Sequence, residues 1–211
     1  MKKFYFLLLF SLFLVCSCRV SDPKIGQARA VVIFDYKSVS SLPSVRMCAF
    51  INFASEYNRF AELKIVNKKE KLVWKITKPV FITDSRNIWA GSTSLYGGSG
   101  PGIPIGDYEV TYTDLAERSV KYYCKVDYPK ELVSTSYSGV FFSESVKQLE
   151  EYVVLFSEKN DILYMGKSTE DLFESDKKIL ERYPSAKTKR TLFAKSNLSY
   201  GVLLPVEAVK N

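Results

Sequence analysis

The sequence contains no histidine among its 211 residues. This absence excludes a Ser-His-Asp or Cys-His nucleophile, an imidazole general base and a histidine-ligated zinc site. An enzyme of this composition would depend on carboxylates, lysine, tyrosine or a thiol. Carboxylates near predicted strand ends, such as Asp107 and Asp114, show no pairing at the set separation that a glycosidase needs. We therefore expect no catalysis and no cofactor, and a carboxylate-based hydrolase is the least favoured alternative.

The sequence also lacks an apolar run long enough to cross a bilayer. Its longest run covers residues 4–15 and is interrupted only by Ser11. A helix of that length spans about 18 Å, whereas the hydrocarbon core of a bilayer is roughly 30 Å thick. Lys2 and Lys3 precede the run, as in the basic start of a secretory signal peptide. We therefore predict that residues 1–17 are an export signal.

The end of this segment reads Val15-Cys16-Ser17-Cys18. This stretch resembles a lipobox, the processing site of bacterial lipoproteins, in the loose form seen in spirochaetes. The resemblance implies that Cys18 becomes the acylated first residue of the mature chain, with residues 18–28 as a tether. It further implies a lipid-anchored protein of the cell envelope, because two or three acyl chains hold a protein stably to a bilayer. A signal peptide without lipidation is the alternative.

The residue after Cys18 bears on the choice of membrane. In many Gram-negative lipoproteins an Asp at this position favours retention in the inner membrane, and this chain has Arg19 there. The resemblance therefore implies the outer membrane, with the protein facing the periplasm or the cell surface.

Positive charge is in moderate excess but is spread along the chain. The formal net charge of +7 falls to +5 when Lys2 and Lys3 leave with the signal. The chain has neither a basic stripe with interleaved aromatic residues nor a known nucleic-acid-binding module. We therefore exclude nucleic acid as a partner and expect the lipid bilayer, together with an envelope protein or a glycan.

The predicted sandwich domain covers residues 29–138, and as far as about residue 128 its hydrophobic pattern has a period of two. Apolar residues recur at every second position in six segments, residues 30–35, 45–53, 61–65, 72–76, 108–112 and 120–126. Short strands with one apolar face, separated by turn residues, are typical of an antiparallel β-sandwich. The predicted fold class is therefore mainly β.

Two motifs resemble immunoglobulin-like domains. Residues 104–112 read Pro-Ile-Gly-Asp-Tyr-Glu-Val-Thr-Tyr and are similar to the entry into a late strand of immunoglobulin-like and fibronectin-type modules on bacterial surfaces. Tyr122-Tyr123-Cys124 resembles the Tyr-x-Cys pattern of immunoglobulin strand F. Trp74 lies further after Cys48 than the immunoglobulin spacing allows. The resemblance therefore implies an immunoglobulin-like sandwich, not a true immunoglobulin domain.

Residues 139–211 differ in character from the predicted sandwich. Ser145 and Ser168 each begin a capping-box pattern, and the helix from Ser168 would end at Pro184. Residues 152–156 and 162–165 predict one hairpin, and residues 191–194 and 200–204 predict another. We expect a small C-terminal α+β annex that packs on the sandwich.

Cys48 and Cys124 are the two cysteines of the predicted body. Outside the cytoplasm they are candidates for a disulfide that would stabilise the fold by roughly 4 kcal/mol. Alternation argues against it, because Cys124 shares a face with Tyr122 whereas Cys48 lies opposite the apolar face of Met47. Both alternatives, a bridge and two free thiols, stay open.

Residues 91–106 hold six of the ten glycines. Their spacing matches neither a Walker loop nor a Rossmann loop, because the expected following element is a strand. One interpretation is a mobile loop at the rim of the sandwich. The functional alternative is a binding rim formed by Trp89, Tyr96 and this loop.

The sequence thus predicts a membrane-anchored extracytoplasmic lipoprotein with a non-catalytic binding or structural role. The alternative is an accessory or assembly subunit of an envelope complex, docking through an exposed strand edge or a helix face.

Overall fold

The computed structural model describes residues 22–54, 57–84, 87–98, 100–168, 171–195 and 199–210. The predicted signal peptide and the predicted lipidation site Cys18 lie outside the described residues. Within those residues, no helix has both the length and the apolar composition needed to cross a bilayer.

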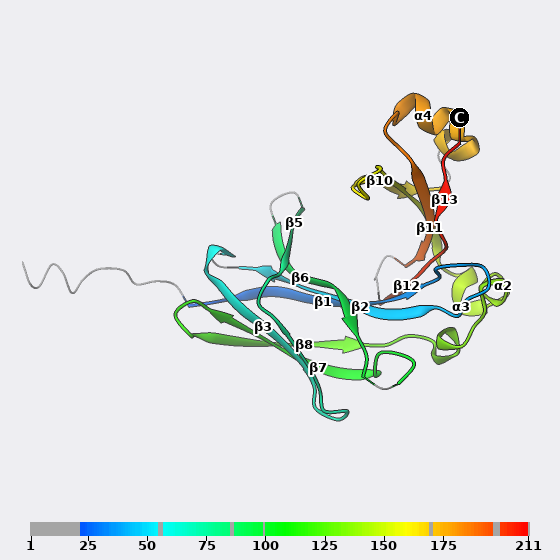
Figure 1. The fold of residues 1–211 in the computed structure, drawn as a ribbon. Coiled ribbons are helices and arrows are strands. Elements are labelled where there is room, and N and C mark those ends of the chain that lie inside the picture. The colour runs from blue at the N-terminus through cyan, green and yellow to red at the C-terminus, as the bar shows by residue number, and fades with distance from the viewer. Residues whose placement is uncertain are drawn as a thin grey trace, which may run out of the picture.

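The described strands form two sheets that pack face to face (Figure 1). The smaller sheet has the order β4-β3-β7-β8, and the larger has the order β10-β9-β11-β12-β1-β2-β6-β5, with β13 beside β11. The strand bounds in chain order are β1 (Ile25–Asp35), β2 (Ser44–Phe53), β3 (Phe60–Asn67), β4 (Leu72–Ile76), β5 (Val80–Asp84), β6 (Asn87–Tyr96), β7 (Gly106–Asp114), β8 (Ser119–Val126), β9 (Glu150–Phe156), β10 (Ile162–Lys167), β11 (Thr188–Ala194), β12 (Tyr200–Leu203) and β13 (Glu207–Ala208). The helical turns are η1 (Tyr57–Arg59), η2 (Lys130–Val133), α2 (Tyr137–Val140), α3 (Glu144–Lys147), η3 (Asp171–Glu174) and α4 (Asp176–Arg182).

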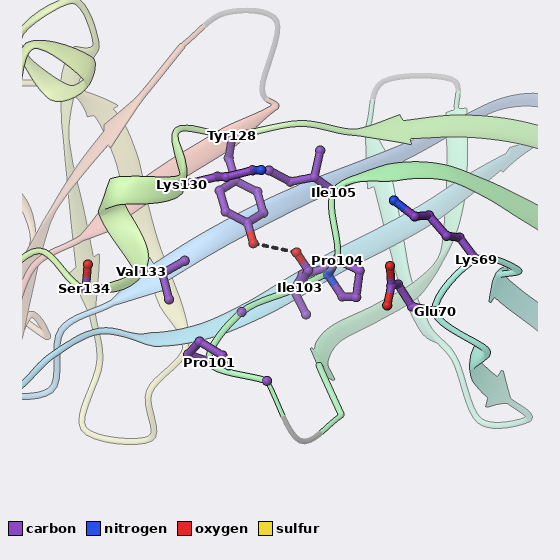
Figure 2. Close-up of a pocket in the computed structure, with 12 residues that line it drawn as sticks. Lys69, Glu70, Pro101, Ile103, Pro104, Ile105, Tyr128, Lys130, Val133 and Ser134 are labelled. Atoms are coloured by element: carbon purple, nitrogen blue, oxygen red, sulfur yellow. Dashed lines mark hydrogen bonds between the residues drawn. The ribbon is translucent and has the colours of Figure 1, made fainter.

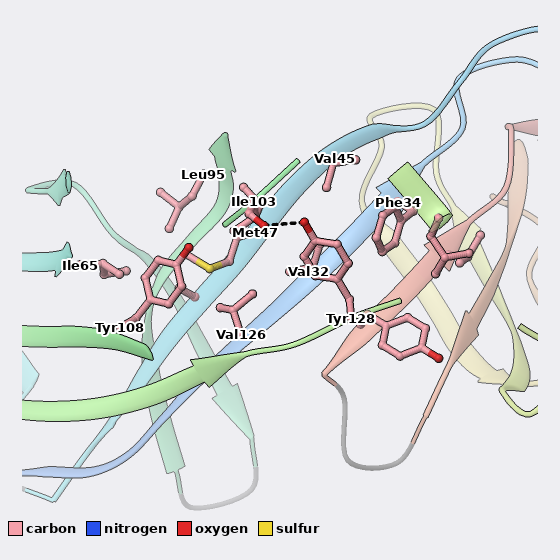
Figure 3. Close-up of a cluster of buried hydrophobic side chains, with 14 of the residues drawn as sticks. Val32, Phe34, Val45, Met47, Ile65, Leu95, Ile103, Tyr108, Val126 and Tyr128 are labelled. Atoms are coloured by element: carbon pink, nitrogen blue, oxygen red, sulfur yellow. Dashed lines mark hydrogen bonds between the residues drawn. The ribbon is translucent and has the colours of Figure 1, made fainter. Parts of the chain in front are cut away.

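The prediction of a mainly β sandwich is confirmed, because period-two alternation gives each sheet one apolar face. In β2, Val45, Met47, Ala49 and Ile51 are buried while the residues between them are partly exposed. Tyr108 and Val126 of the smaller sheet meet Met47 and Phe34 of the larger one in the core (Figure 3). The six predicted strands correspond to β1, β2, β3, β4, β7 and β8.

The C-terminal residues continue the larger sheet. Both predicted hairpins are present, as β9 with β10 and β11 with β12. β12 lies beside β1 in parallel, with Phe34 opposite Val202, so the strands are not all antiparallel. Strands from both sides of the boundary predicted at residue 139 belong to the larger sheet. β1 begins at Ile25, within the segment predicted as a tether, residues 18–28.

The C-terminal strands nevertheless have a small core of their own. Val153 and Leu155 of β9 pack there with Ile179 and Ala186, and α4 covers this face. Figure 1 shows β9, β10, β11 and α4 rising from one end of the sandwich, while the described chain begins at the other. The helix predicted from Ser168 begins later, because Ser175 is the residue whose hydroxyl accepts from the Lys178 amide, at 3.4 Å.

Candidate binding groove

The predicted binding rim is not a single site. Trp89 and Tyr96 both belong to β6, seven residues apart, which separates them by roughly 20 Å along the strand. The Arg29 guanidinium covers the Trp89 ring at 5.0 Å, and the Tyr96 carbonyl accepts a hydrogen bond from the Trp74 indole. Because they sit at opposite ends of β6, the two side chains cannot form one aromatic platform. The glycine-rich loop is also shorter than predicted, since residues 91–96 are part of β6.

The rest of that loop lines an open groove of about 580 Å³ (Figure 2). Three segments that are distant in the sequence meet there: the β3–β4 turn, the β6–β7 loop and the segment after β8. The lining includes Lys69, Pro101, Ile103, Ile105, Lys130 and Val133. The groove therefore has an apolar floor and lysines at its rim.

Two tyrosine hydroxyls hold the loop against the core. Tyr128 donates to the carbonyl of Ile103, and Tyr108 donates to the carbonyl of Pro104 at 2.6 Å. Burial raises the pKa of Tyr108 to about 12 and also raises the pKa of Tyr128, so both hydroxyls keep their protons at neutral pH. Ile103 is 1% exposed. Hydrogen bonds within the chain therefore fix the loop that lines the groove.

The turn on the other side is also built by local geometry. Asn67, a buried residue, accepts a hydrogen bond from the Glu70 amide at 3.0 Å, and Lys71 has a φ of 52°. Gly106 starts β7 with a φ of +142°, which a residue with a side chain rarely adopts. These features direct Lys69 and Glu70 toward the groove, as Figure 2 shows.

A second hollow of about 370 Å³ adjoins the groove and shares Lys69 and Ile105 with it. Its wall carries Glu109, whose carboxylate binds Lys68 at 2.7 Å and Lys121 at 2.9 Å. Hydrogen bonds from Lys68 and Lys121 lower the pKa of Glu109 to about 2, so it stays ionised. Within the described part of the chain, no ion pair engages Lys69 or Lys130.

Two carboxylates singled out in the sequence, Asp107 and Asp114, lie near opposite ends of β7. Asp107 lines the second hollow, but Asp114 is 2% exposed at the far end of β7 and is occupied by Arg118 at 2.7 Å. The described residues contain no group of three or more Cys, Asp or Glu placed to hold a metal ion.

Both cysteines of the body are free. Cys48 faces away from the core, where its thiol accepts a hydrogen bond from Arg46 at 3.2 Å. Cys124 belongs to the other sheet and packs against the core, where burial raises its pKa to about 11. The faces match those expected from alternation, and the geometry favours two free thiols over a bridge.

Comparison with protein-family models, curated proteins and solved structures finds no match for this chain. The groove is therefore defined by this chain's own geometry. Of its components, the glycine-rich loop was recognisable in the sequence, whereas the roles of Tyr128 and Lys130 were not. The pair Tyr128-Pro129 after the last alternating strand was a signal for a chain reversal, but it does not indicate which segment lies opposite.

Proposed function

We propose that the chain is a membrane-anchored lipoprotein of the cell envelope that binds its partner, without catalysis, in the groove between residues 69–70, 100–105 and 128–134. The anchor is Cys18, on the strength of the lipobox resemblance, and the outer membrane is the proposed location. The binding role is supported by the position of the groove, which lies far from residue 22, where the described part of the chain begins.

Asp22, the first described residue, and the groove lie at opposite ends of β7. Asp22 binds Arg118 at 3.3 Å, beside the turn that follows Asp114 at the end of β7. Gly106, the first residue of β7, lines the hollow next to the groove. Nine residues span eight steps of about 3.3 Å, or about 26 Å in total. A chain held to the bilayer at its N-terminus would therefore present the groove to a partner away from the lipid surface.

The lining indicates the kind of partner. Pro104, Ile105 and Val133 offer accessible apolar surface in the groove. At the rim, the positive charges of Lys69 and Lys130 exceed the one negative charge of Glu70. This combination suits an extended segment of an envelope protein with apolar and acidic side chains. The separation of Trp89 from Tyr96 removes the aromatic platform that would have favoured a glycan.

The anchor is tested by feeding cells radiolabelled palmitate and comparing Cys18→Ala with Cys16→Ala. We expect Cys18→Ala to lose the label and leave the membrane fraction, and Cys16→Ala to keep both. Label retained by membrane-bound Cys18→Ala would contradict the anchor.

The groove is tested by photo-crosslinking in cells, with the probe at Ser134 in the groove or at Ser138 outside it. We expect an adduct from position 134 only, and we expect the double variant Lys69→Glu, Lys130→Glu to abolish it. Equal adducts from the two positions, or an adduct that survives the charge reversal, would argue against the groove. Sedimentation of detergent extracts then distinguishes a lone tethered protein from a subunit of a larger complex.

A further inference from the structure

The strand β5 is an edge strand with an unusual surface. It is hydrogen-bonded to β6 on one side, and its other side is the end of the larger sheet. Val80 is 48% exposed, Phe81 50% and Ile82 44%, so three consecutive large apolar residues meet solvent. Figure 1 shows β5 and the adjoining end of β6 projecting beyond the body of the sandwich. Steric access to this edge is therefore open.

Both edge strands of the smaller sheet and the strand at the opposite end of the larger sheet carry lysine. β4 has Lys75, β8 has Lys121 and Lys125, and β10 has Lys167. Lysine on an edge strand opposes pairing with another chain, because its charge would be buried in the new interface. β5, with the sequence VFITD, has no basic residue. Of the four strands at the ends of the two sheet orders, β5 is the one without lysine.

We infer that β5 pairs antiparallel with β5 of a second copy of this chain, in the register that places Phe81 opposite Phe81. Val80 then lies opposite Ile82, two aliphatic residues that fit one another on the same face. Such a self-complementary segment is what a two-fold interface requires.

Each face of the new pair continues an existing cluster. Ile82 is the register partner of Trp89, so the Val80–Ile82 pairs extend the surface that carries Trp89 and Arg29. Phe81 lies on the other face, with its ring centroid 6.3 Å from that of Phe60. A second Phe81 would add to the same aromatic cluster. The larger sheet would then run continuously through two copies.

This interface is separate from the proposed function, because no residue of β5 lines the groove. Loss of dimerisation would leave groove adducts in place, and loss of groove binding would leave the dimer in place. The two proposals can therefore fail independently.

The register is tested by single cysteine substitutions in the full chain, purified in detergent and oxidised. Residues directly opposite in an antiparallel pair have Cα atoms about 5 Å apart, within reach of a disulfide. In the proposed register, two copies of residue 82 are about 8 Å apart, which is out of reach. We expect Phe81→Cys to form covalent dimers and Ile82→Cys to remain at the background of the unsubstituted chain. Equal cross-linking of the two variants would overturn the register.

The interface itself is tested by light scattering or sedimentation of the same purified chain. We expect twice the monomer mass for the unsubstituted chain and the monomer mass for Ile82→Lys. The matched control is Val73→Lys, because Val73 is 46% exposed on the edge strand β4 and should leave the dimer intact. Circular dichroism checks that each variant is folded. A monomeric unsubstituted chain, or a dimer that survives Ile82→Lys, would overturn the inference.

Discussion

Replacing Arg190 by Met should destabilise the protein at the junction between the sandwich and the C-terminal strands. Asp35, at the end of β1, is 3% exposed, and its Oδ1 atom lies 2.6 Å from the Nη2 atom of Arg190 in β11. The same guanidinium donates to the carbonyl of Leu204 at 2.7 Å and to that of Tyr36 at 3.2 Å. One side chain therefore joins β1, β11 and the residue after β12.

The magnitude follows from burial. Removing one partner of a buried ion pair costs about 3–5 kcal/mol, because the other charge is left uncompensated. Two other cations offset part of this loss: Lys37 binds Asp35 at 2.7 Å with a side chain that is 68% exposed, and Arg46 lies 3.7 Å from the same carboxylate. We expect Arg190→Met to lower the free energy of unfolding by about 3 kcal/mol. Lys37→Met, the control, should cost less than about 1 kcal/mol, because it removes an exposed partner.

Urea unfolding of the variants measures both values. The double variant Asp35→Asn, Arg190→Met should lose less than the sum of the single variants, because the two side chains stabilise each other. A loss below about 1 kcal/mol for Arg190→Met, or additive losses in the double variant, would refute this account of the junction.

The same pair predicts a dependence on pH. Burial alone would raise the pKa of the Asp35 carboxyl, but hydrogen bonds and charge from Lys37 and Arg190 hold it below 3.8. Folding lowers this pKa. The stabilisation from the ionised carboxylate is therefore complete above pH 3.8, and it is lost as the pH falls through the lower pKa of the folded state. Arg190→Met should flatten this loss, which urea midpoints measured at decreasing pH would show.

Two further predictions concern the cysteines and one glycine. With a pKa near 11 against an ordinary value of 9.0, Cys124 should react with iodoacetamide at pH 8 about 100-fold more slowly in the folded protein than in urea. In urea without reductant both Cys48 and Cys124 should be alkylated, and thiols that become reactive only after reduction would indicate a bridge. A Cβ atom at Gly91 would overlap the backbone carbonyl of Ala49 in β2, so Gly91→Ala should cost about 3 kcal/mol in urea unfolding. Gly98→Ala, which meets nothing within 4 Å, should be neutral, and equal effects of the two substitutions would contradict the close approach.

The strands of the sandwich were predictable because alternation is a local property. Successive side chains on a strand point to opposite faces, so the burial of Val45 and Met47 follows from spacing alone. β5 was not predicted, because an edge strand exposed on both faces has no alternation to detect. The helix expected from Ser168 was misplaced, because Ser175 caps α4 although it lacks the acidic residue that follows Ser168 three positions later.

The candidate site was only partly predictable. The glycine-rich loop marked one wall of the groove, but Trp89 and Tyr96 were grouped with it through their proximity in the sequence. Along an extended strand, seven residues correspond to roughly 20 Å, so proximity in the sequence did not mean proximity in space.

By itself the sequence determined the fold class, the strands with one buried face, and the absence of any chemistry that needs histidine. These properties depend on composition and on the geometry of single strands. The tertiary structure alone decided that β12 lies beside β1, that residues 69–70, 100–105 and 128–134 meet at one groove, and that β5 is left at an edge. Each of these depends on which distant segments pair, and that choice is made by burial and hydrogen bonding across the whole chain.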